Sequence, residues 1–395
     1  MSKFIPLSVP NIKGNELKYV TEALESEWVS TGGAMIDKFE KNISNYVHST
    51  GAVACQSGTA GLHLSLHQLG IRESDAVIVP TLTFIAAVNP VRYEKAEPIF
   101  MDCDDSLCID PIKLRKYLSE DCIRENGKIF DKELKKQIKA IIVVHVFGNM
   151  ADMESIMDIS NEFAIPVIED ATEALGTYYT EGKYKGKFAG TIGTIGVFSF
   201  NGNKIMTTGG GGMIVSQSQE ILDKIKYYST QAKDDSVNFV HNEIGYNYRM
   251  TNIQAAVGIA QLENLEDFIK TKSDNYWLYK NTLDKVAGLK ILDFRNGIRS
   301  NYWFYSLLLK NREETPHKII TFLKSNNIQA RPIWGLISKQ KPYSHNKSYK
   351  IEKAYYYYER VVNIPCSTNL SFDDVNSVIS VLKKKLGGTN GWRND

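Results

Sequence analysis

The chain has few of the features that mark secreted, metal-binding or membrane proteins. The 395 residues include five cysteines, which is an odd number, and no two of them form a CxxC pair. Neither a disulfide framework nor a zinc knuckle is therefore indicated. The seven histidines show no HExxH or His-x-His spacing, which leaves no sign of a metal site. No run of about eighteen apolar residues and no signal-like N-terminus occurs. We therefore expect a soluble cytoplasmic protein with packed thiols and with neither metal nor membrane partner.

An excess of charge of one sign is also absent. The 47 lysines and arginines nearly balance the 45 aspartates and glutamates, so no overall field favours nucleic acid. The sequence has no G-x-G-x-x-G that opens a helix after a strand and no GK[ST] phosphate loop, which argues against a nicotinamide dehydrogenase. Any anion must therefore be bound by a few local groups.

Between residues 50 and 215, short apolar runs alternate with helical patterns. Helices are predicted over 59–69 and 150–164 from the spacing of their apolar residues. The run at 141–144 is continuously apolar, as in a sheet that is covered on both faces. The pattern predicts an α/β fold with a mainly parallel central sheet and helices on both faces. The predicted strands are 52–55, 76–79, 98–101, 141–146, 167–169, 197–200 and 213–215.

The C-terminal third has a different pattern, which predicts a smaller α+β domain. A long helical region at 252–287 precedes a strand at 301–309 and helices at 318–326 and 372–386. We expect a large domain over 14–264 and a small domain that consists of 265–395 together with 1–13. The charged stretch 119–139 interrupts the α/β rhythm and is interpreted as a surface hairpin or flap.

The first chemical motif is a turn between a strand and a helix. Ser57, Gly58 and Thr59 follow the strand at 52–55 and open the next helix. Such a turn offers free N–H groups and the positive end of the helix dipole to a phosphate. Taken alone, this motif is better explained as a plain N-cap.

Two further motifs follow buried strands. Asp170 ends the strand at 167–169, at the sheet edge where α/β proteins bind ligands. Lys204 follows the strand at 197–200 and precedes four glycines, 209–212, which suit a close backbone approach. Burial would lower the pKa of the Lys204 amine and so favour its neutral form, which is a nucleophile. Alone, Asp170 fits a structural ion pair and Lys204 a solvated turn. A phosphate cradle, an acid for a ring nitrogen and an amine for an aldehyde together match pyridoxal 5'-phosphate.

With these motifs the chain resembles the DegT/StrS family of sugar aminotransferases over nearly its whole length. The resemblance implies the type I aminotransferase fold, with Lys204 as the covalent cofactor anchor and Asp170 as the partner of the pyridine nitrogen. It also implies an obligate homodimer, in which Asn247 reaches the phosphate of the neighbouring subunit. The other implied cofactor contacts are Ser57, Gly58, Thr59 and Ser199 at the phosphate, Phe84 on the ring and Glu173 beside the ring hydroxyl.

The segments 6–10 with 14–16, 199–204 and 330–334 look closest to aminotransferases of bacillosamine and legionaminic acid synthesis. This implies amination, with glutamate as donor, at C4 of a nucleoside-diphosphate-linked 2-acetamido-4-keto-6-deoxy hexose. Amination at C3, another sugar-modifying reaction on this cofactor and a non-catalytic regulator are the alternatives. The candidate substrate contacts are the cations Arg249 and Arg331 and the aromatic residues Trp334 and Tyr343.

Overall fold

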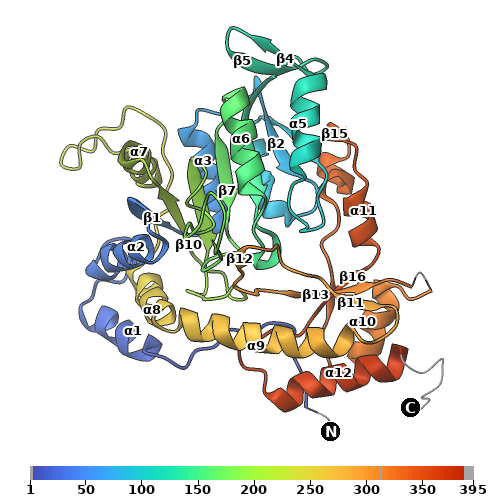
Figure 1. Ribbon diagram of the computed structural model, residues 1–395. Coiled ribbons are helices and arrows are strands. Elements are labelled where there is room, and N and C mark those ends of the chain that lie inside the picture. Colours follow the sequence, from blue (N-terminus) through green and yellow to red (C-terminus); the bar gives the residue numbers. More distant parts are fainter. Residues whose placement is uncertain (1–2, 312, 387–395) are drawn as a thin grey trace.

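The computed structural model describes residues 3–311 and 313–386, and its centre is a ten-stranded sheet (Figure 1). Eight strands follow the order β1-β10-β9-β7-β6-β2-β3-β15, and the hairpin β4–β5 joins at β6. Each strand that the sequence predicts between residues 50 and 215 corresponds to a strand of the structure, but the one predicted at 141–146 ends at Val144, because the backbone turns into the short helix η2 (Val146–Gly148). The strands are β1 (Gly51–Cys55), β2 (Asp75–Pro80), β3 (Glu97–Met101), β4 (Cys122–Glu125), β5 (Lys128–Asp131), β6 (Gln137–Val144), β7 (Val167–Asp170), β9 (Ile195–Ser199), β10 (Gly212–Ser216) and β15 (Ser348–Tyr349).

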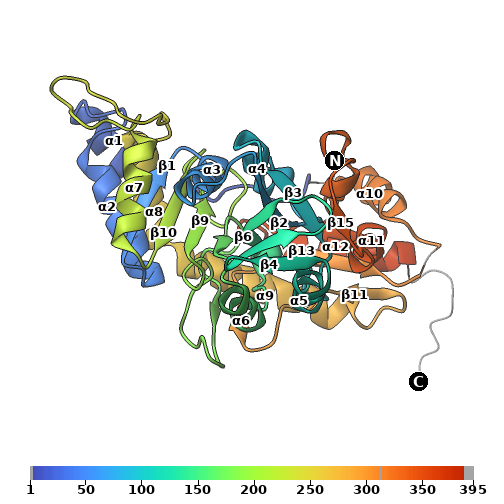
Figure 2. The ribbon, with the colours of Figure 1, turned by 90° about the horizontal axis from the view of Figure 1, so that it is seen from above.

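The middle of this sheet is parallel. The pairs β15–β3, β3–β2, β2–β6, β6–β7 and β7–β9 run parallel, whereas β10 is antiparallel to both β9 and β1. Figure 2 shows α3 and α4 on one side of the sheet and α5 and α6 on the other. The predicted α/β fold with a mainly parallel sheet is thus confirmed. These helices are α3 (Gly58–Gln68), α4 (Asn89–Tyr93), α5 (Pro111–Glu120) and α6 (Met153–Phe163), and α7 (Gln219–Ser229) follows β10.

Local capping chemistry explains where several helices begin. Asp110 accepts hydrogen bonds from the N–H groups of Ile112 (2.8 Å) and Lys113 (3.2 Å), with Pro111 in the first turn of α5. Thr251 begins α8 with a capping box, in which its partner is Gln254. Each cap satisfies N–H groups that a helix N-terminus leaves unpaired.

The second sheet is small and antiparallel, with the order β11-β13-β16-β14. It lies with helices α9, α10 and α12 at the lower right of Figure 1. Its strands are β11 (Leu289–Ile291), β13 (Tyr305–Leu309), β14 (Arg331–Pro332) and β16 (Val361–Ile364), and a separate pair is formed by β8 (Tyr178–Tyr179) and β12 (Ile298–Arg299). The remaining helices are α1 (Glu16–Glu25), α2 (Ala34–Val47), α8 (Asn252–Glu263), α9 (Leu265–Leu283), α10 (Pro316–Ser325), α11 (Lys353–Tyr358) and α12 (Phe372–Leu386).

Two sequence predictions in the C-terminal third need correction. The helical region 252–287 is divided at Asn264 into α8 and α9. The strand predicted at 301–309 begins only at Tyr305. Before it, Asn301 Oδ1 accepts the N–H of Trp303 (3.0 Å) and Tyr302 has a φ of 54°, so the backbone turns instead of extending.

Contacts between the early and the late parts of the chain cross the predicted domain boundary. Ile5 bridges Ile328, whereas the late strand β15 pairs with β3 of the large sheet. Asp102, just after β3, accepts hydrogen bonds from the N–H groups of Glu352, Lys353 and Ala354 at the start of α11 (2.8–3.0 Å). The division into domains 14–264 and 265–395 with 1–13 therefore stays a prediction.

The charged stretch 119–139 forms the predicted hairpin, β4–β5. It is anchored to the fold by Asp131, which is fully buried. The Asp131 carboxylate accepts hydrogen bonds from the Tyr117 hydroxyl and, at 2.8 Å, from Lys347 Nζ. Across residues 3–311 and 313–386, no helix has both the length and the apolar character needed to cross a membrane.

Candidate active site

A cavity of about 610 Å³ lies where the C-terminal ends of β7 and β9 meet the N-terminus of α3. This is the sheet edge at which α/β folds bind ligands. The cavity brings together most of the site residues predicted from the sequence: Ser57, Gly58, Thr59, Phe84, Asp170, Glu173, Ser199, Lys204, Arg331 and Trp334.

The turn into α3 forms one wall of the cavity. Ser57 is the N-cap, whose Oγ accepts the N–H of Ala60 at 3.1 Å. A Cβ at Gly58 would lie 2.8 Å from Thr172 Cγ2 and 3.0 Å from Ser199 Cβ. The first N–H groups of α3 thus stand at the cavity wall, where the helix dipole favours an anion.

The glycine run after Lys204 brings β10 close to this turn. A Cβ at Gly212 would lie 2.6 Å from the backbone carbon of Ser57 and 2.8 Å from the nitrogen of Gly58. No side chain can occupy that space without moving the turn. The close backbone approach predicted from the glycines is therefore confirmed at Gly212, within this chain.

Asp170 is the buried acid of the cavity. It ends β7, and its Oδ1 accepts the N–H of Thr172 at 3.1 Å. Burial raises the pKa of Asp170, while the hydrogen bond from Thr172 and the charge of Lys204 act in the opposite direction. A buried carboxylate in this position requires a cationic partner, which a protonated ring nitrogen would provide.

Lys204 and Glu173 form an ion pair in the same cavity. Lys204 Nζ lies 3.8 Å from Glu173 Oε1, and both side chains are almost wholly enclosed. Burial lowers the pKa of the Lys204 amine, while the carboxylates of Glu173 and Asp170 raise it. Burial has the opposite effect on the carboxyl group of Glu173, whose pKa it raises to about 7. The desolvated lysine is thus favoured in its neutral, nucleophilic form.

Trp303 is a site residue that sequence reasoning missed. The centroid of its ring is 4.2 Å from Lys204 Nζ, and its indole N–H donates to the Asn203 carbonyl at 2.7 Å. Lys272 Nζ in turn donates to the carbonyl of Trp303 at 3.0 Å. Trp303 therefore holds both the backbone and the amine of the lysine segment. No local sequence signal reveals this contact, because Trp303 lies far from Lys204 in the sequence, just before β13 of the small sheet.

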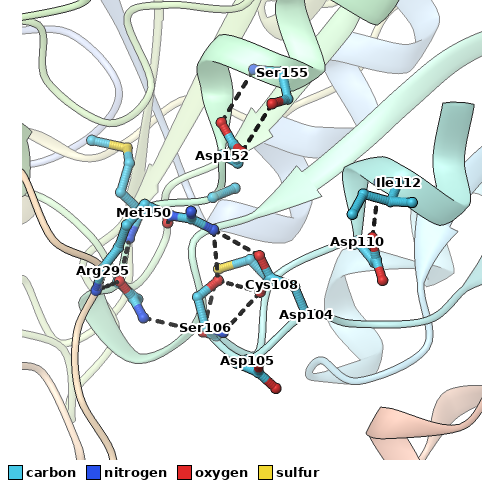
Figure 3. A network of polar contacts seen from close by, with 12 residues as sticks. Asp104, Asp105, Ser106, Cys108, Asp110, Ile112, Met150, Asp152, Ser155 and Arg295 are labelled. Atoms are coloured by element: carbon cyan, nitrogen blue, oxygen red, sulfur yellow. Dashed lines mark hydrogen bonds and ion pairs between the residues drawn. The ribbon is translucent and has the colours of Figure 1, made fainter. Parts of the chain in front are cut away.

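The backbone of Phe147 fixes Glu173. Its N–H donates to Glu173 Oε2 at 2.7 Å, from the short helix η2 (Val146–Gly148). The segment that follows η2 is tied down by Arg295, whose Nε donates to the Met150 carbonyl (2.9 Å) and whose Nη2 donates to Asp104 (2.7 Å), as Figure 3 shows. Arg295 belongs to the loop after β11, so the small sheet helps to hold the wall that carries Glu173.

Three predicted residues mark the open side of the cavity. Phe84 is 55% exposed, and Arg331 at the start of β14 is exposed as well. Trp334 is half-buried and packs on Phe147, with ring centroids 4.5 Å apart. An aromatic ring and a guanidinium are thus accessible at the cavity mouth.

Asn247, Arg249 and Tyr343 do not line the cavity of this chain. Asn247 is exposed. The guanidinium of Arg249 faces Glu40, with Nη2 3.6 Å from Oε1, and its buried Nε has no hydrogen-bond partner among the described residues. Tyr343 is buried and donates its hydroxyl hydrogen to Asn89 Oδ1 at 2.6 Å. Arg249 and Tyr343 are therefore engaged elsewhere, and the structure does not support them as substrate contacts within one chain.

The residues of the cavity fit pyridoxal phosphate: they provide an enclosed amine, an enclosed carboxylate and, for the phosphate, a helix N-terminus at the cavity wall. The fold and this cavity together define an aminotransferase that depends on that cofactor. More narrowly, the chain belongs to the DegT/DnrJ/EryC1/StrS aminotransferase family, whose model matches residues 10–383.

Individual relatives agree with this assignment. EpsN of Bacillus subtilis (strain 168), named as a pyridoxal phosphate-dependent aminotransferase, is 37% identical over 390 residues, which cover 97% of this chain and 96% of that protein. GDP-perosamine synthase of Escherichia coli O157:H7 is 36% identical, covering 94% and 96%. A DegT DnrJ EryC1 StrS aminotransferase from Brucella abortus has a crystal structure that matches with a TM-score of 0.85 and 25% identity, covering 94% and 95%. The chain is thus a sugar aminotransferase of this family.

Proposed function

We propose that the enzyme transfers an amino group from glutamate to C4 of a nucleoside-diphosphate-linked 2-acetamido-4-keto-6-deoxy hexose. The observation that carries the substrate class is the charge of the cavity lining, in which Lys204 and Arg331 are the cations. Lys204 is required for the cofactor, so Arg331 remains for an anionic substrate. Its guanidinium has no acceptor among the described residues, and its planar shape suits a carboxylate or a phosphate. The relative named GDP-perosamine synthase likewise takes its name from a nucleotide-linked amino sugar.

The cofactor would be held by the residues already placed at the cavity. Bound pyridoxal phosphate supplies an aldehyde for the amines and an electron-withdrawing ring. Ser57, Gly58, Thr59 and Ser199 would bind its phosphate, and Phe84 would cover the ring. Asp170 would face the ring nitrogen, while Lys204 would hold the aldehyde carbon and then move protons.

The substrate is tested by supplying the 4-keto-6-deoxy-2-acetamido sugar as its uridine and its guanosine diphosphate, each with glutamate. We expect an amino sugar from at least one of them, identified by mass spectrometry. In Arg331→Ala the KM for that nucleotide sugar should rise about tenfold or more, because a charge-assisted contact is lost. If both sugars remain unchanged while a 3-keto isomer is aminated, the C4 assignment is wrong.

We also propose a homodimer with shared active sites. Asn247 is exposed outside the cavity, and the adjoining loop 233–245 exposes four apolar side chains. Exposed apolar residues that gather in one loop fit a protein interface. These side chains are Val237, Phe239, Val240 and Ile244.

Subunit mixing tests the shared site. Lys204→Ala and Asn247→Ala chains should each be inactive, and a mixture with verified exchange should regain part of the activity. Heterodimers would contain one site in which both residues are intact, because Asn247 would act across the interface. Failure to regain activity in verified heterodimers would contradict the proposal.

The proposed location is the cytoplasm. The five cysteines all lie within the described residues, where each is buried and free. Free thiols persist in reducing compartments, which supports this location.

A further inference from the structure

Lys204 Nζ has three kinds of neighbour within the cavity. Glu173 Oε1 is 3.8 Å away, the ring centroid of Trp303 is 4.2 Å away, and Asp170 contributes a more distant negative charge. The carboxylates and the aromatic face stabilise the ammonium. Burial opposes them, because a desolvated pair of charges is costly.

Glu173 and Asp170 differ in the cationic partner that each would have once a cofactor is bound. Asp170 would have the ring nitrogen as its cation. Glu173 has one oxygen fixed by the Phe147 N–H, and its other oxygen points to Lys204. Besides Lys204, the charge that acts on Glu173 is that of Asp170, which repels it. When the amine loses its charge, the Glu173 carboxylate is therefore left buried without a cation.

We propose that Glu173 is a second acid–base group of the site, which takes up the proton that Lys204 releases when its amine becomes a nucleophile. An N–H bond at Nζ breaks, an O–H bond at Oε1 forms, and both groups become neutral. A small rotation of the flexible Lys204 side chain would bring Nζ from 3.8 Å to hydrogen-bond distance of Glu173 Oε1, where the proton can pass directly. Burial favours this exchange at both ends, since it lowers the pKa of Lys204 and raises that of Glu173. The part of Glu173 in the reaction rests on the proposed role of Lys204.

The pairing itself can be tested without the cofactor. The full chain, freed of pyridoxal phosphate, is labelled with trace acetic anhydride at a series of pH values, and the Lys204 peptide is quantified by mass spectrometry. In Glu173→Gln, which keeps the shape and the acceptor for Phe147, the loss of the anion destabilises the ammonium. Labelling should then begin at lower pH and be at least about threefold faster below the wild-type inflection.

Two further variants make the result specific. Glu94→Gln removes a carboxylate that pairs with His63 and His67 outside the cavity, so the Lys204 inflection should not move. Glu173→Asp keeps a carboxylate but withdraws it from Nζ, so the inflection should move in the same direction by less; this variant also serves if Glu173→Gln does not fold.

An unchanged inflection in a folded Glu173 variant would overturn the proposal. In the loaded enzyme, the acid limb of the pH–kcat profile should move with the same variants. If the cofactor were mapped to another lysine, the proposed function would fail while the labelling result would still stand, so the two failures are distinguishable.

Discussion

Replacing Lys204 by alanine is expected to abolish transamination, with a loss of at least about 10⁴-fold in kcat. Lys204 is the lysine of the cavity lining, and its amine is desolvated between Glu173 and Trp303. Its removal would take away both the proposed covalent anchor and the group proposed to move protons. The variant should keep its fold, because the Asn203 carbonyl still accepts the Trp303 indole N–H.

Borohydride reduction followed by peptide mapping checks the assignment. Lys272 provides a matched control: it is also buried, and burial lowers its pKa, but its Nζ donates to the carbonyls of Trp303 and Cys366 and does not line the cavity. Lys272→Met should cost stability and leave the label on Lys204. A label on any other lysine of the wild-type chain would refute the assignment.

Asp170→Asn is expected to lower kcat by about 10² to 10⁴-fold while the cofactor still binds. The amide is isosteric but carries no charge, so the ring nitrogen would lose the partner that keeps it protonated. The hydrogen bond from the Thr172 N–H can be retained by the amide oxygen. Binding should therefore persist while the chemistry slows.

The rate and the cofactor absorbance are measured together for this prediction. Asp102→Asn is the matched control, since Asp102 is a fully buried carboxylate just after β3 that caps α11. That change should lower the stability and leave the absorbance of the bound cofactor unchanged. Turnover near the wild-type rate in Asp170→Asn would disprove the role of Asp170.

Local patterns in the sequence were sufficient for the parts of the site that follow strands. Asp170 ends β7 and Lys204 lies in the segment that follows β9. The two strands are adjacent and parallel, so the meeting of these residues follows from the sheet order. The turn at Ser57 was predictable because an apolar strand runs there directly into a helix. The fold class was equally accessible, because the buried strands are continuously apolar and short.

Contacts set by tertiary packing were not predictable. Trp303 and the Phe147 N–H reach the cavity only because the small sheet and the Arg295 loop pack there. Residue type also did not reveal that Arg249 and Tyr343 lie outside the cavity lining of a single chain. A cation and an aromatic residue suit a substrate, but Glu40 and Asn89 on other elements engage them. A single sequence does not show which of two suitable partners a side chain meets.

The cavity lining extends along the chain from Leu7 to Asn363. Contacts between such distant residues form late, since long loops must close first. During synthesis the lysine segment would therefore leave the ribosome long before Trp303 and Arg331 arrive to enclose it. A ligand that binds only the completed cavity stabilises the folded chain by mass action. The supply of pyridoxal phosphate would therefore affect the fraction of this protein that stays folded, as well as its rate of turnover.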